Sequence, residues 1–190
     1  EDSELKFVGN QDMINLIAKG PLSSHIMTID RWYRETDEEY GLFFEDDVSF
    51  DNNEYWNFTL KEFVNSLPSD CEAIQLCCIY QVEPDIRVRL RDHLDHGLQA
   101  YVLKRSYVKK LLNDLRVDRN TFSVKDPHVS LSVENYIFND KYGRVYSFPL
   151  FNHNVKDFNS TVVNLEETNK NLVDGQSHLA LPSYETILEW

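Results

Sequence analysis

The segment Tyr40–Val48 reads Tyr-Gly-Leu-Phe-Phe-Glu-Asp-Asp-Val, and its apolar run, Leu42–Phe44, is typical of a short buried strand. Three carboxylates follow this run without a break. Because successive side chains of a strand alternate between its faces, we expect Glu45 and Asp47 to point the same way. They would lie at the carboxyl end of the strand, where open α/β sheets place their ligands.

Two carboxylates on one face indicate a cation site, because like charges at close range repel each other unless a cation lies between them. Mg²⁺ and Mn²⁺ prefer oxygen ligands, and Mg²⁺ usually binds one or two carboxylates together with substrate phosphates. The pair Glu45 and Asp47 therefore predicts a metal–diphosphate site. The alternative is a solvated acidic turn that binds nothing.

Length and composition describe a globular protein. The chain has 190 residues, which is one domain or one domain plus a tail, and 42% of them are hydrophobic. The formal net charge of −13 argues against nonspecific binding to nucleic acids or anionic membranes, which requires basic surface. No apolar run approaches the roughly 18 residues of a membrane span, so we expect no transmembrane segment.

The three cysteines, Cys71, Cys77 and Cys78, form neither a disulfide framework nor a Cys-x-x-Cys pair. Cys77 and Cys78 lie in the apolar stretch 73–80, which favours buried thiols. Free thiols are typical of a reducing compartment, so we expect a cytoplasmic protein.

Apolar spacing predicts an α/β domain with a mixed sheet flanked by helices. Helices are expected at 22–33, started by Pro21 or Ser23, at 53–64, at 106–115, capped by Ser106, and at 127–138. Strands are expected at 42–44, 72–80, 86–90, 98–103 and 144–151. Only 5–8 precedes the first helix as a plausible strand, so we expect the chain to lack an N-terminal nucleotide-binding βα unit. The domain would cover 1–165, and 166–190 would form a C-terminal arm.

Four blocks in order resemble glycosyltransferase family 25, which includes bacterial lipopolysaccharide galactosyltransferases and procollagen galactosyltransferases. Residues 20–32 resemble its Gly-x-x-x-Ser-His helix that ends in Trp, and Glu45–Val48 matches its Glu-Asp-Asp-Val. Residues 97–112 are similar to its Gly-x-x-Ala-Tyr strand and the helix that follows. Residues 149–162 resemble its closing Pro-Leu-Val-x-Gln segment, with His153 or Asn154 in place of the Gln.

The resemblance implies a glycosyltransferase-A type domain that moves a hexose, galactose or glucose, from a nucleoside-diphosphate sugar to a saccharide or hydroxylysine-like protein acceptor. It implies that Glu45 and Asp47 bind Mn²⁺ or Mg²⁺, with His153 completing the metal shell. It implies donor contacts by Ser24, His25, Asp46, Gln99 and Ala100.

Each of these residues also has a structural interpretation. Ser24 and His25 suit a capping and packing pair, and Gln99 and Ala100 suit strand packing. Asp126 precedes Pro127 at an expected helix start, where it is either the N-cap or the base that deprotonates the acceptor hydroxyl; Glu134 is the next candidate for that base.

Three further interpretations stay open. Arg87, Arg89 and Arg91 suit either a phosphate site or a solvated strand face. The whole chain suits a non-catalytic, carbohydrate-binding or scaffold domain of glycosyltransferase type, which the missing nucleotide-binding strand would favour. The acidic cluster also suits a phosphohydrolase, although no second group of metal ligands is evident.

Overall fold

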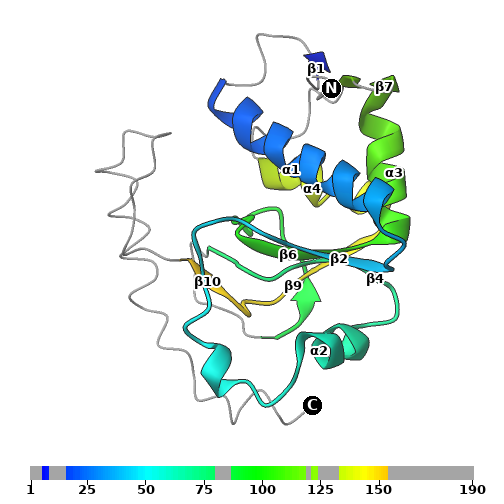
Figure 1. Ribbon diagram of the computed structural model, residues 1–190. Coiled ribbons are helices and arrows are strands. Elements are labelled where there is room, and N and C mark those ends of the chain that lie inside the picture. Colours follow the sequence, from blue (N-terminus) through cyan, green and yellow to red (C-terminus); the bar gives the residue numbers. More distant parts are fainter. Residues whose placement is uncertain (1–5, 9–15, 80–86, 119–120, 124–132, 154–190) are drawn as a thin grey trace. The chain divides into compact units, whose positions relative to one another are not determined.

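The computed structural model describes residues 6–8, 16–79, 87–118, 121–123 and 133–153. These residues form an α/β protein with a five-stranded mixed sheet and, within the described ranges, four α-helices (Figure 1). The chain divides into two compact units, each of which combines two segments. Unit 1 contains residues 1–41 and 103–143, and unit 2 contains residues 42–102 and 144–190.

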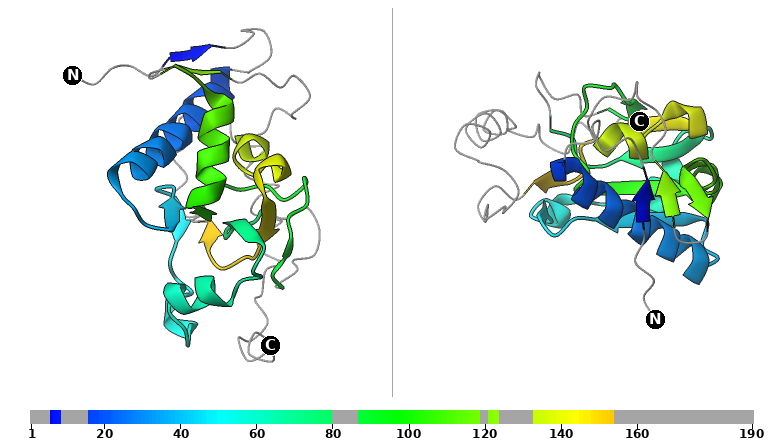
Figure 2. Two further views of the ribbon diagram at one scale, coloured as in Figure 1. Left: turned by 90° about the vertical axis from the view of Figure 1, so that its right-hand side faces the viewer. Right: turned by 90° about the horizontal axis from the view of Figure 1, so that it is seen from above.

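Unit 1 is mainly helical. Helix α1 (Leu16–Glu35) contacts α3 (Arg105–Leu115) and α4 (Val133–Ile137), and the 3₁₀ turn η2 (Asp140–Tyr142) contacts α3 (Figure 2). The apolar faces of these elements are buried, with Ile26, Ile29, Tyr107, Val108, Leu111 and Ile137 at its centre.

A small sheet completes the described part of unit 1. Strand β1 (Lys6–Val8) pairs in parallel with β8 (Thr121–Ser123), which pairs antiparallel with β7 (Arg116–Asp118). The expected N-terminal strand therefore exists, but its partner is β8 and it takes no part in the five-stranded sheet.

The five-stranded sheet has the order β2-β6-β4-β9-β5. Its strands are β2 (Tyr40–Phe44), β6 (Ala100–Lys104), β4 (Cys71–Gln75), β9 (Arg144–Ser147) and β5 (Arg89–Leu90). Strands β4 and β9 are parallel, and β5 is antiparallel to β9. Unit 2 also holds a short antiparallel pair, β3 (Val48–Ser49) with β10 (Asn152–His153), the 3₁₀ turn η1 (Asn53–Tyr55) and helix α2 (Leu60–Ser66).

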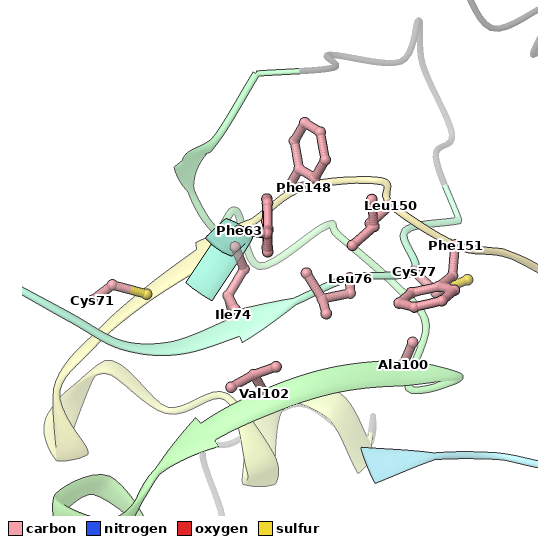
Figure 3. Packing of buried hydrophobic residues seen from close by; sticks show 10 residues of the cluster. All are labelled: Phe63, Cys71, Ile74, Leu76, Cys77, Ala100, Val102, Phe148, Leu150 and Phe151. Atoms are coloured by element: carbon pink, nitrogen blue, oxygen red, sulfur yellow. The ribbon is translucent and has the colours of Figure 1, made fainter. Parts of the chain in front are cut away.

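The core of unit 2 packs around β4 and β6. Ten buried side chains from these strands, from α2 and from 148–151 form one cluster (Figure 3). Cys71 and Cys77 belong to it, and all three cysteines are buried free thiols, as the sequence predicted for Cys77 and Cys78. Burial of this apolar surface is the main contribution that holds the sheet together.

A buried polar network lies beside this core. Asp95 is 4% exposed, and its carboxylate accepts two hydrogen bonds from Arg89, at 2.6 and 2.7 Å. It also accepts from the Asp92 amide at 2.9 Å and from the Ser147 hydroxyl at 3.1 Å. Burial raises the pKa of Asp95, but the Arg89 hydrogen bonds, the Asp92 amide, the Arg89 charge and the Ser147 hydroxyl together outweigh it and lower the pKa.

Gln75 continues this network from the end of β4. It is fully buried, and its Nε2 donates to the carbonyl oxygens of His96 and Gly97 at 2.9 and 2.8 Å. Its Oε1 accepts from Nε of Arg91 at 2.9 Å, and Arg91 Nη2 donates to the Asp95 carbonyl at 2.7 Å. The loop 91–97 is thereby fixed to the sheet.

Several predicted elements differ in extent. Helix α1 begins at Leu16 rather than at Pro21 or Ser23, and Pro21 lies inside it. The helix expected at 53–64 is instead η1 followed by α2, which starts with a capping box formed by Thr59 and Glu62. Helix α3 is preceded by Lys104 at the N-cap without a side-chain cap, so Ser106 is not its cap.

The strands also differ from the prediction: β2 is longer, and β4 and β9 are shorter. Strand β4 ends at Gln75, and of the segment expected at 144–151 only Arg144–Ser147 forms a strand, β9. Strand β2 is half-buried rather than buried, because its pattern alternates and Leu42 and Phe44 are exposed. Of the helix expected at 127–138, only 133–138 lies in the described residues, where α4 covers Val133–Ile137; the arm 166–190 lies outside them.

We predict that Asp95→Asn lowers the free energy of unfolding by roughly 3 kcal/mol near neutral pH, because Arg89 would lose its paired charge. The lowered pKa of Asp95 also has a pH signature. In the parent the unfolded carboxyl takes up its proton first, so stability falls as the pH drops below about 5 toward the lower folded pKa. Urea unfolding at several pH values measures both effects.

The matched control is Asp92→Asn, because Asp92 is exposed in the same loop and its carboxylate contacts close neighbours in the sequence, the Leu94 amide at 2.9 Å and Nδ1 of His93 at 3.0 Å. We expect Asp92→Asn to change the free energy of unfolding by at most about 0.5 kcal/mol. An Asp95→Asn variant with the parent's acid-side slope would contradict the role assigned to Asp95.

We also predict that Gly97→Ala destabilises the protein by about 1–3 kcal/mol. Gly97 has φ +113°, and a Cβ there would lie 2.8 Å from the Cys77 carbonyl oxygen, which is backbone and cannot move aside. Urea unfolding measures the change, with Leu94→Ala as a control at an exposed position of the same loop. Equal midpoints for the two variants would contradict the prediction.

Candidate functional site

The acidic residues of the opening segment form the turn between β2 and β3 in unit 2. The sequence predicted that Glu45 and Asp47 continue the strand, but β2 ends at Phe44 and the turn takes over. Asp46 is exposed, whereas Glu45 and Asp47 are half-buried and Oδ1 of Asp47 is buried. The turn therefore directs one carboxylate to solvent and draws the other two partly into the fold.

Gln99 joins this turn to the start of β6. The Glu45 amide donates to the Gln99 carbonyl at 2.9 Å, so the two residues are neighbours across the sheet. The Gln99 side chain is 8% exposed, and its buried Oε1 has no hydrogen-bond donor among the residues that the structure describes. A buried acceptor that lacks a donor is costly, so this oxygen fits a ligand that brings a hydroxyl or a cation.

Gly97 allows the backbone to approach closely beside Gln99. A Cβ at Gly97 would be 2.8 Å from the Cys77 carbonyl oxygen and 2.9 Å from Oε1 of Gln99. Both oxygens therefore lie close to the place where any residue other than glycine would have its Cβ atom.

The electrostatics of Cys77 link this point to the acidic turn. Burial raises the pKa of the Cys77 thiol well above its usual range, and the nearby charges of Cys78, Asp47 and Glu45 raise it further. Burial also raises the pKa of Tyr101, with a further contribution from Glu45. Cys77 is thus a protonated thiol at neutral pH rather than a nucleophile, and it lies within the electrostatic field of Glu45 and Asp47.

The pairing of β10 with β3 brings the backbone of His153 next to the acidic turn. His153 pairs with Val48, the residue after Asp47, and Asn152 pairs with Ser49. The Phe151 amide holds this segment by donating to the Leu76 carbonyl at 2.9 Å. The side chain of His153 lies outside what the structure describes, so its part in a metal shell stays a prediction.

Ala100 packs in the core, which was the structural alternative to a donor contact. It is fully buried in the core cluster, and its carbonyl accepts from the Leu76 and Cys77 amides at 2.8 and 3.2 Å (Figure 3). It anchors the strand directly after Gln99.

The remaining predicted residues belong to unit 1 or lie outside the description. Ser24 and His25 are in the interior of α1, which begins at Leu16, so they do not cap that helix. Glu134 is half-buried in the first turn of α4. Asp126 lies outside the described residues. Their donor and catalytic roles therefore remain predictions.

Sequence reasoning missed the network that supports this site. Arg89 and Arg91 were expected at a phosphate site or on a solvated face, but they bind Asp95 and Gln75 instead. The signal was weak: Gln75 is a lone polar residue within an apolar stretch, and Asp95 is one of several charged residues in a loop.

A metal would find few protein ligands in the described part. No group of three His, Cys, Asp or Glu side chains there lies close enough to hold a metal ion. The donors available are the carboxylates of Glu45 and Asp47 and the Gln99 amide oxygen.

Comparison with known proteins adds no assignment. No protein-family model matches this chain, and no curated protein is detectably similar to it. Within the described residues, no helix combines the length and apolar character that crossing a membrane requires.

We predict that Gln99→Leu leaves the free energy of unfolding unchanged or raises it by about 1 kcal/mol, because it removes a buried acceptor that has no donor within the described residues. Thermal and urea unfolding measure this effect. If Gln99 instead had a purely structural hydrogen bond, the same change would destabilise the protein by about 1–3 kcal/mol, and that result would refute the ligand-facing interpretation.

Proposed function

We propose that this chain is a metal-dependent glycosyltransferase that moves a hexose, galactose or glucose, from a nucleoside-diphosphate sugar to a saccharide or protein acceptor. One observation supports it most: the Glu45–Asp47 turn lies beside Gln99, whose buried side-chain oxygen has no hydrogen-bond donor among the described residues. The Glu-Asp-Asp-Val of this turn is also the block that most resembles glycosyltransferase family 25. The proposed domain type is glycosyltransferase-A.

The residues of the site fit Mn²⁺ or Mg²⁺. Both carboxylates and the Gln99 amide offer hard oxygen donors, and Oδ1 of Asp47 is buried. Two protein carboxylates are enough for Mg²⁺ when substrate phosphates and water supply the other ligands. When bound, the ion would offset the charge of the leaving diphosphate.

The other side chains of the site would orient the donor. Oε1 of Gln99 would accept from a sugar hydroxyl, and the exposed Asp46 would accept from a ribose hydroxyl. The half-buried Glu45 would hold its neighbour Gln99 through the backbone hydrogen bond. We propose Asp126 as the base that deprotonates the acceptor hydroxyl, with Glu134 as the next candidate.

A non-catalytic carbohydrate-binding or scaffold domain is the second candidate, and the pairing of β1 favours it. In the described strands, the N-terminal β1 pairs with β8, so the five-stranded sheet begins with β2 and has no counterpart of the family's base-binding strand. A domain of this kind would bind a sugar without transferring it.

We predict that Asp47→Asn abolishes Mn²⁺-dependent binding of uridine-diphosphate galactose and glucose, measured by calorimetry, because the amide loses the charge that binds the ion. The thermal midpoint should stay within a few degrees, about what a loss of 1 kcal/mol would cause. Asp51→Asn is the matched control, since it makes the same chemical change at an exposed residue of the same unit.

The outcomes separate the two candidates. Metal-dependent release of uridine diphosphate that Asp47→Asn loses supports the transferase. Metal-dependent binding of the nucleotide sugar without release, or sugar binding without metal, supports the non-catalytic domain. If parent and Asp47→Asn bind nucleotide and metal equally well, the metal assignment is wrong.

A further inference from the structure

The segment 40–60 of the chain combines acidic and aromatic residues and carries no Lys, Arg or His. Five carboxylates lie within it: Glu45, Asp46, Asp47, Asp51 and Glu54. Glu45 and Asp47 belong to the site described above. The other three are exposed in unit 2: Asp46 precedes β3, Asp51 lies between β3 and η1, and Glu54 lies in η1.

Four aromatic residues of this segment are exposed, and three of them belong to unit 2. Phe44 is 40% exposed, Phe50 is 46% exposed and Tyr55 is 59% exposed. Large apolar side chains gathered on a surface commonly mark an interaction site.

Buried aromatic residues hold these rings in place. Phe44 and Phe50 meet edge to face at 5.1 Å between ring centroids, and both pack edge to face on the buried Phe151, at 5.1 and 5.4 Å. Trp56 also packs edge to face on Phe151, at 5.2 Å. Phe44 and Phe50 are thus held by ring contacts, so a ligand would bind them without first ordering them.

The exposed carboxylates have no ion-pair partner among the residues that the structure describes. In the part of the chain that the structure describes, no Lys, Arg or His forms an ion pair with Asp46, Asp51 or Glu54. A hydrogen bond to Glu54 and its charge raise the pKa of Tyr55, which shows that the carboxylate and the ring lie together.

Charge and ring faces on one surface select the same kind of ligand. Carboxylates attract cations, and aromatic faces attract Lys and Arg through cation–π contacts. A neutral saccharide would stack on the rings and donate hydroxyls to the carboxylates, but it would not gain the charge attraction that a polycation gains, and a nucleic acid would be repelled.

We propose that Phe44, Asp46, Phe50, Asp51 and Glu54 form an acidic–aromatic surface that binds a Lys- or Arg-rich polypeptide segment. This interaction goes beyond the proposed function, because it requires neither a metal nor sugar transfer.

The test uses the full chain and a fluorescent peptide of about eight lysines, roughly 26 Å long when extended. Fluorescence anisotropy measures its binding between about 0.01 and 0.15 M salt. We expect Asp51→Asn with Glu54→Gln to weaken binding at least about fivefold and to reduce its salt dependence, because two attractive charges are lost. Phe50→Leu should weaken binding about threefold without changing the salt dependence, since it keeps apolar packing but removes the ring.

The matched control is Asp37→Asn with Glu38→Gln, which removes the same charge at two exposed residues outside this surface. It should leave binding within twofold of the parent. Equal weakening by both double variants would show a diffuse effect of net charge and would overturn the proposal, as would a peptide that does not bind at low salt. Preferential binding of a neutral oligosaccharide that Phe50→Leu abolishes would instead assign the rings to carbohydrate and would also overturn it.

Discussion

The charge of Asp95, buried in unit 2, is the constraint on which the described site depends. A charged carboxylate loses most of its hydration on burial, and only charged or hydrogen-bonded partners can compensate for that loss. Arg89 supplies two hydrogen bonds, and the Asp92 amide and Ser147 hydroxyl supply two more. These partners come from β5, from the following loop and from β9. The hydrogen bonds of one carboxylate therefore fix the relative position of three segments.

The same network determines where Gln99 lies. Gln75 and Arg91 bind the carbonyl oxygens of residues 95–97, and this fixes the path of the chain immediately before β6. Gly97 then lets the backbone pass close to the Cys77 carbonyl. Buried polar groups of this kind specify one arrangement more than they add net stability, because an apolar replacement would pack equally well but would hold no loop in register. Here the arrangement that they specify brings Gln99 beside the acidic turn.

The sequence predicted the α/β class and the approximate position of most elements, because periodicity reports which faces are buried. It failed where tertiary contacts decide. The run Leu42–Phe44 looked fully buried, but β2 lies at an edge of the sheet and exposes alternate residues. The helix expected at 53–64 is interrupted because Thr59 and Glu62 form a capping box that starts α2 anew. The acidic turn and Gln99 were found as candidates from motif and residue type. Asp95 and Gln75 were not, because partners distant in sequence define their roles and no local pattern marks them.

The carboxylates of the acidic turn and of the residues after it lie in two different environments, one partly buried and one exposed to water. Asp47 is half-buried, and a compact divalent ion of high charge density would fit there, whereas Asp46, Asp51 and Glu54 face water, where a flexible organic cation can bind. If both proposed interactions occur, they are coupled, because an ion bound by Glu45 and Asp47 cancels two negative charges beside the outer surface. A cationic peptide would then bind more weakly to the metal-loaded protein, and by linkage the metal would bind more weakly in the presence of the peptide. The two proposed sites would thus weaken each other because both depend on the same group of negative charges. This coupling follows from the absence of basic residues in segment 40–60 and requires no movement of the fold.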